Sequence, residues 1–179
     1  TFRIWEKDKV FEDVIYAIRN FKPDVIINRF DHRTPGKTHG HHTGSAMLAF
    51  EAFDKAADPN VYPHQLKELG VWQARRQFFN TSWWFYGGRD KFAKADKSNL
   101  VPMDVGAYFA TTGISNNEIS ALARSKHRSQ GFGSSGDRGA YQEYLEIING
   151  DLPADKSNIF DGIDTSWKRI DVGQTIYPI

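Results

Sequence analysis

Apolar residues recur every three or four positions between residues 7 and 21, a spacing that places them on one face of a helix. The positions are Val10, Phe11, Val14, Ile15 and Ile18. The sequence therefore predicts an amphipathic helix over Lys7–Phe21, ended by Pro23 because the residue before a proline disfavours helical backbone. The apolar run Val25–Ile27 that follows predicts a short strand buried on both faces, as in parallel sheets.

A polar loop over residues 31–40 leads into a second predicted helix, Thr43–Ala57, which also carries an apolar stripe. A short helix is predicted over Pro63–Leu69. The aromatic segment Gln77–Tyr86 predicts a strand ended by two glycines, and the charged residues 89–99 predict a connector. The order helix, buried strand, polar loop and helix is typical of an α/β layered domain.

The second half of the chain contains one well-marked helix start. Ser115 and Glu118 have the spacing of a capping box, which predicts a helix that continues to about Ser129. The segment Tyr141–Ile148 fits a strand or a helix equally well. Residues from Asp151 onward have little periodicity, so we expect the folded part to comprise residues 1–150 and residues 151–179 to form a tail or a linker toward a further region.

Composition narrows the function classes. Lysine and arginine total 23 and aspartate and glutamate 22, a net charge of +1, which argues against a nucleic-acid surface spread over the chain. The absence of cysteine excludes disulfides and thiolate chemistry, and it fits cytoplasmic and exported proteins alike, so the compartment stays open. No apolar run approaches the ~18 residues of a membrane span. The chain begins at Thr1 without an initiator methionine, and we expect it to be a piece of a longer protein.

Four of the six histidines fall between residues 32 and 42, just after the predicted buried strand. Imidazole binds zinc and transfers protons near neutral pH. Ligands bind open α/β sheets at the carboxyl ends of strands, where this segment lies. Neighbouring side chains diverge, so the segment is expected to supply one or two ligands of a metal, with Asp31 and Asp104 as candidate acids. The alternative is a solvated histidine-rich turn.

Two segments together resemble the PIG-L/LmbE family of zinc-dependent N-deacetylases, which includes N-acetylglucosaminyl-phosphatidylinositol de-N-acetylase. The first is Phe21-Lys22-Pro23-Asp24-Val25-Ile26-Ile27, similar to a family strand. The second is His39-Gly40-His41-His42-Thr43-Gly44-Ser45-Ala46, similar to an H-P-D-H motif that opens a helix. The segment Arg124–Gln130 also resembles the closing helix of the family, so the resemblance runs from about Val10 to Gln130.

The resemblance implies a three-layer, Rossmann-like parallel sheet with helices on both faces and an enzyme that removes the N-acetyl group of an amino sugar or related N-acyl glycoside. It implies that His42 is a zinc ligand and that His39 stabilises the tetrahedral intermediate. His41 stands where the family has aspartate. The resemblance leaves Asp31, Arg29 and His127 as supporting or substrate-binding candidates.

The A-H-P-D-D motif that supplies the family's other zinc ligands and general base has no counterpart here. The resemblance therefore implies a fold truncated at its N-terminal side, with residues 1–150 forming the C-terminal portion of the deacetylase domain. We expect this chain alone to bind zinc weakly or not at all and to be inactive. We also expect it to self-associate through the face that truncation exposes.

Two other functions stay open at this point. In a non-catalytic carbohydrate-binding module, Trp83, Trp84 and Tyr86 would stack on sugar faces. In a different metallohydrolase, such as a phosphoesterase, the same histidines would act with Arg29 and Arg33 as the phosphate-binding groups.

Overall fold

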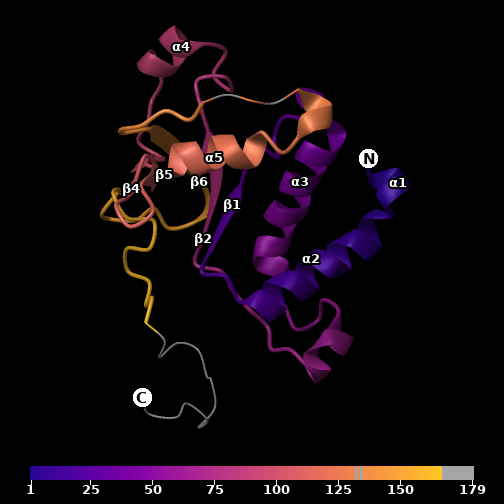
Figure 1. Cartoon of the computed structure of the whole chain (residues 1–179). Helices are drawn as coiled ribbons and strands as arrows, with labels where there is room; N and C mark the ends of the chain where they lie inside the picture. The colour runs from indigo at the N-terminus through magenta and orange to yellow at the C-terminus, as the bar shows by residue number, and fades with distance from the viewer. Residues whose placement is uncertain (132, 134, 167–179) are drawn as a thin grey trace.

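The computed structural model describes residues 1–131, 133 and 135–166 (Figure 1). The helices are α1 (Phe2–Trp5), α2 (Lys7–Phe21), α3 (Gly40–Lys55), α4 (Arg89–Lys94) and α5 (Asn116–Arg124), with 3-10 turns η1 (Pro63–Lys67) and η2 (Arg128–Gln130). The strands are β1 (Val25–Asn28), β2 (Arg76–Thr81), β3 (Leu100–Asp104), β4 (Tyr108–Phe109), β5 (Ile114–Ser115) and β6 (Gln142–Gly150). Across these residues we find no helix with the length and apolar character needed to span a membrane.

The protein is a mixed α/β structure built on a four-stranded sheet of order β1-β2-β6-β3. Strands β1 and β2 are parallel, whereas β6 runs antiparallel to both β2 and β3, so the prediction of a parallel sheet is wrong for two of the three pairings. The apolar run in β1 had suggested burial on both faces, yet Ile27 is 50% exposed. Among the described residues, strand β1 has a strand partner on one side only. An apolar run also does not encode the direction of a neighbouring strand.

Two apolar clusters hold the fold together. In the first, α2 packs on α3 through Phe11, Ile15, Ile18, Leu48 and Ala52; Figure 1 shows these two helices side by side. In the second, Phe78, Val101 and Leu145 from three strands meet Ile159. Ile159 belongs to the segment predicted as a tail, so this segment packs against the sheet at least that far. The rest of that prediction, residues 167–179, lies outside the described residues.

Several element boundaries differ from those predicted. The second helix begins at Gly40 rather than Thr43, and the strand after it ends at Thr81, with Trp83–Tyr86 in a turn. The charged connector contains a short helix, α4, and the ambiguous segment at 141–148 is a strand, β6. The capped helix α5 ends at Arg124 rather than about Ser129.

The capping box at the start of α5 is confirmed. Ser115 Oγ accepts the amide N–H of Glu118 (3.3 Å), and Glu118 Oε2 accepts the amide N–H of Ser115 (2.9 Å). Arg138 Nε also donates to Glu118 Oε1 (2.9 Å). The hydrogen bond from the backbone N–H of Ser115, followed by the hydrogen bond from Arg138, holds the pKa of Glu118 below its ordinary 4.5. The charged form of Glu118 therefore stabilises the folded chain.

We expect Glu118→Gln to lower the stability of the chain at neutral pH but not in acid. A carboxylate whose pKa is lower in the folded than in the unfolded state adds stability above its unfolded pKa, and this stability is lost as pH falls through the folded pKa. The difference in free energy of unfolding between wild type and variant should therefore reach its maximum above about pH 5. It should vanish when the pH falls below the lowered pKa of Glu118 in the folded chain. Urea denaturation at a series of pH values measures it, and a difference independent of pH would contradict the charged capping role.

Candidate active site

The start of α3 holds the histidine-rich segment in place. His39 precedes the helix with extended backbone (φ −61°, ψ 142°), and its carbonyl accepts the amide N–H groups of His42 and Thr43. Gly40 packs against Thr1, because a Cβ there would lie 2.1 Å from Thr1 Oγ1. The helix begins at the end of the sheet where β1 stops, so the histidines lie at the carboxyl end of that strand (Figure 1).

Of the three histidines at the start of α3, His42 is the partly buried one. Its ring stacks on Phe30, with the centroids 3.9 Å apart and the planes 9° from parallel. Its Nδ1 is buried, and no group among the described residues forms a hydrogen bond with it. Burial lowers the pKa of His42, and electrostatic repulsion from His41 and His39 lowers it further. The imidazole is therefore neutral at neutral pH, which is the form that binds a metal ion.

His39 and His41 lie beside His42 but are exposed. Their ring centroids are 5.4 and 4.1 Å from that of His42. In the part of the chain that the structure describes, no three histidine, aspartate or glutamate side chains are arranged to hold a metal ion. The candidate acid Asp104 lies elsewhere, at the end of β3, where it accepts the amide N–H groups of Gly106 and Tyr141.

Asp31 belongs to a partly buried ion network in the loop after β1. Asp31 Oδ1 accepts both the amide N–H and the Nε–H of Arg33, the latter at 2.8 Å. The two Nη groups of Arg33 donate to both carboxylate oxygens of Glu146 at 2.8 Å each, and this bond raises the pKa of Arg33. Asp31 and Glu146 are both buried. The network therefore fastens the loop that carries Phe30 to strand β6.

Sequence reasoning missed Glu146 in this region, and it named His32 only as a member of the histidine cluster; the Nδ1 of His32, like that of His42, is buried and forms no hydrogen bond with a described residue. Glu146 lies between the apolar residues Leu145 and Ile147 of β6, and a charged residue inside an apolar strand is a signal that could have identified it. His32 stacks on Phe50 of α3, with centroids 3.9 Å apart. Burial lowers the pKa of His32, and the charge of Arg33 lowers it further. Two histidine–phenylalanine stacks thus hold the loop along α3.

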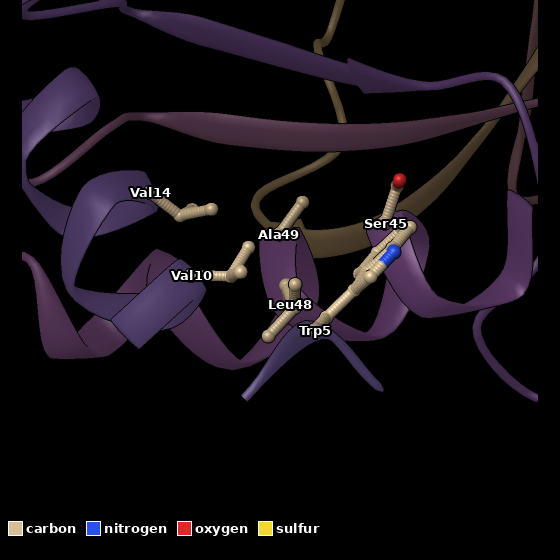
Figure 2. A pocket seen from close by; sticks show the side chains of 6 residues that line it. All are labelled: Trp5, Val10, Val14, Ser45, Leu48 and Ala49. Carbon is tan, nitrogen blue, oxygen red and sulfur yellow. The ribbon is translucent and has the colours of Figure 1, made fainter. Parts of the chain in front are cut away.

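Two of the grooves in the structure border α3, and one of these two is lined by a histidine and an arginine. The first groove has a volume of about 390 Å³. Figure 2 shows its lining side chains, which are apolar apart from the hydroxyl of Ser45 and the indole nitrogen of Trp5. The other groove, about 300 Å³, lies between β1 and α3 and is lined by Ile26, Ile27, Phe30, Ala46, Arg29 and His42 among others. Arg29 therefore lines the same groove as His42.

The remaining candidate residues are His127 and the aromatic residues Trp83, Trp84 and Tyr86, which are far in sequence from the histidine-rich segment. His127 is exposed and caps η2, after α5. Trp83 and Trp84 are 42% and 53% exposed, in the turn after β2. That turn is anchored by Phe85, which packs edge-on against Phe79 of the core. Burial, followed by the charge of Glu146, raises the pKa of Tyr86, whose ring packs against that of Phe92 with the centroids 4.9 Å apart.

Comparison with solved structures found a weak structural likeness. No protein-family model matches the chain, and no curated protein sequence is significantly similar to it. The N,N'-diacetylchitobiose deacetylase of Pyrococcus horikoshii, solved in complex with its inhibitor MPG, shares 22% identity with a TM-score of 0.37. The match covers 40% of this chain and 27% of that chain. Because the likeness is weak, the site has to be judged on the residues of this chain.

Proposed function

We propose that this chain contributes two histidines to a zinc-dependent deacetylase of N-acetyl sugars. His42 supports the proposal: its imidazole is neutral, its ring is fixed against Phe30, and its buried Nδ1 has no partner among the described residues. A neutral imidazole held in one orientation is suited to bind a metal ion. His42 also lines a groove at the carboxyl end of β1, the edge where α/β sheets bind ligands.

His42 fits one position of a zinc site, and the described residues do not complete that site. Catalytic zinc takes three protein ligands and keeps one position open, whereas the described residues include no group of three donors suited to a metal ion. The proposal therefore assigns the remaining ligands and the general base to residues other than the described ones, and the sequence of this chain lacks the A-H-P-D-D motif that supplies them in the family. On this basis we expect the chain alone to release no acetate from N,N'-diacetylchitobiose.

His39 is assigned to the oxyanion of the tetrahedral intermediate. Its ring lies 5.4 Å from that of His42, centroid to centroid, so an amide carbonyl that is bound beside His42 would be within reach of an imidazole N–H. The ring is exposed, which leaves it open to a substrate. This residue would donate a hydrogen bond as negative charge develops on the carbonyl oxygen.

We expect His42→Ala to weaken zinc binding by about tenfold or more, since loss of groups that merely support a ligand already costs 10- to 100-fold. Titration of the full chain with zinc, followed by the imidazole NMR signals, measures the affinity and identifies the first histidine to respond. His64→Ala is the matched control, because His64 is exposed and pairs with Glu12 at 2.6 Å, away from α3. Equal affinity in wild type and His42→Ala, or acetate release by the chain alone, would contradict the proposal.

A carbohydrate-binding module without catalysis is the second candidate, favoured by the exposed indoles of Trp83 and Trp84. Binding of N,N'-diacetylchitobiose that is lost in Trp84→Ala and unaffected by His42→Ala would favour this function over the first.

A further inference from the structure

Two exposed tryptophans and a group of cations lie together in the turn after β2 and in helix α4. Trp83 and Trp84 are 42% and 53% exposed, and Arg89, Lys91 and Lys94 of α4 are exposed as well. Figure 1 shows α4 at the upper end of the molecule in this view. We infer that this surface, which we call the α4 apex, docks on a membrane whose surface carries anionic lipids.

The α4 apex is fixed to the core before any partner binds. The Trp83 carbonyl accepts the amide N–H groups of Tyr86 and Gly88, at 3.2 and 3.0 Å. The Gly88 carbonyl accepts the amide N–H of Phe92, at 3.1 Å. The Phe92 ring packs edge-on against Tyr86 and against Tyr144 of β6, with the centroids 4.9 Å apart in both pairs. A surface that is already ordered loses little conformational entropy on binding.

Positive charge is concentrated at the α4 apex. Residues 83–98 contain four cations and two anions, a net charge of +2, whereas the whole chain carries +1, so the remaining residues carry −1. Lys156 adds a cation beside this segment, because its Nζ donates to the carbonyl of Ser98. One of the two anions, Asp96, accepts the amide N–H and the hydroxyl of Ser98. Each cation held near an anionic membrane surface strengthens binding by about fivefold.

The two indoles supply the apolar part of the contact. An indole combines a large apolar ring system with one N–H donor, and tryptophan is enriched where lipid headgroups meet acyl chains. Exposed apolar patches rimmed by polar residues mark interaction sites. The long stems of Lys91 and Lys94 allow their ammonium groups to remain at the headgroups while the neighbouring indoles of Trp83 and Trp84 enter the boundary.

The cations favour a membrane over a neutral sugar as the partner of this surface. The guanidinium of Arg89 lies over the ring of Trp83, 5.0 Å from the centroid. One face of this indole is therefore covered by a cation and is not open to a sugar ring. A neutral sugar also presents no charge to Lys91 and Lys94, whereas an anionic lipid surface attracts both.

The test is co-sedimentation of the full chain with vesicles that contain phosphatidylcholine and phosphatidylserine in equal amounts. We expect the chain to bind these vesicles with a blue shift of its tryptophan fluorescence. Vesicles of phosphatidylcholine alone should bind at least about tenfold more weakly, because they carry no net charge. Salt at about 1 M, where the Debye length falls to about 3 Å, should weaken binding to the anionic vesicles.

Two variants separate the apolar and the electrostatic parts of the contact. Trp84→Ala removes the more exposed indole and should weaken binding to the anionic vesicles at least about tenfold. Lys91→Gln combined with Lys94→Gln should weaken it about 25-fold, from about fivefold for each cation. Thermal unfolding of both variants, with midpoints close to that of the wild type, establishes that they fold.

Matched controls remove the same kinds of side chain elsewhere. Phe21→Ala deletes an aromatic ring that is 81% exposed at the end of α2. Lys55→Gln combined with Lys67→Gln deletes two exposed lysines, at the end of α3 and in η1. Both controls should bind the anionic vesicles as the wild type does, because neither changes the α4 apex.

Three outcomes would overturn the inference. They are the absence of binding to anionic vesicles, equal binding to vesicles of phosphatidylcholine alone, and losses in the controls as large as those in the apex variants. Binding of N,N'-diacetylchitobiose that Trp84→Ala abolishes, without binding to anionic vesicles, would assign the apex to a sugar and would also overturn it. Neither zinc nor turnover is measured, so a failed deacetylase proposal would leave these results unchanged.

Discussion

Arg19→Met is expected to destabilise the chain by about 3–5 kcal/mol, because it removes the donor of several buried or partly buried hydrogen bonds at once. Arg19 is fully buried in the last turn of α2. Nε donates to the carbonyl of Ala56 (3.1 Å), Nη2 to that of Asp58 (2.8 Å), and Nη1 to the carbonyl of Tyr62 (3.3 Å) and Gln65 Oε1 (3.2 Å).

The size of this effect follows from the acceptors that the variant leaves behind. These oxygens belong to the segment that leads from α3 through η1, and methionine offers them no donor. A buried acceptor without a donor costs about 1–3 kcal/mol. Arg19→Lys should also be destabilising, because an ammonium group lacks the planar fork that reaches acceptors on several sides.

Urea denaturation of the full chain measures the loss. Arg3→Met is the control, since Arg3 is exposed on α1 and its replacement should stay within about 0.5 kcal/mol. A loss below about 1 kcal/mol for Arg19→Met would show that water or a local rearrangement satisfies the carbonyls, and the role assigned to the guanidinium would be wrong.

Arg33→Met is expected to destabilise the chain by about 2–4 kcal/mol, slightly less than the 3–5 kcal/mol for fully buried pairs because the Arg33 side chain is 47% exposed. The variant removes the cation between the buried carboxylates of Asp31 and Glu146. It also releases the loop that holds Phe30 against His42. We therefore expect zinc binding at His42 to weaken together with stability.

The charge origin of this effect can be tested by a second substitution. Glu146→Gln added to Arg33→Met should recover part of the lost stability, since a neutral amide costs less to bury than an unpaired carboxylate. Arg75→Met is the matched surface control, because Arg75 pairs with Asp151 at 2.9 Å with both side chains more than half exposed, and it should cost less than about 1 kcal/mol. Equal losses for Arg33→Met and Arg75→Met would contradict the buried network.

Local chemistry decided the elements that the sequence predicted well. Helix α2 spans Lys7–Phe21 as predicted, because its apolar stripe and the proline after it act within a few residues of the backbone they shape. The Ser115–Glu118 capping box is likewise a contact between residues three apart. The end of α5 has no comparable local signal, and the predicted end was several residues too late.

Local sequence signals could not predict which distant segments pair as strands. The segment 141–148 carries a pattern that suits a strand or a helix, and its identity as β6 depends on β2 and β3 lying on either side of it. The parallel sheet failed as a prediction for the same reason, since strand direction depends on the path of the chain between strands. The resemblance likewise did not locate Glu146, which lies more than a hundred residues from its partner Arg33.

By itself, the sequence of this protein determined its mixture of helices and strands, a balanced charge, and a histidine cluster after a short apolar strand, because composition and short-range spacing are properties of the chain alone. Only the tertiary structure decided that His32 and His42 each have a buried ring nitrogen with no hydrogen-bond partner among the described residues, and that Arg29 lines the groove that contains His42. Burial and pKa depend on segments that meet only after folding, among them β1, α3, α5 and β6. The protonation state and accessibility of the candidate site residues therefore depend on how these segments pack together in the folded chain.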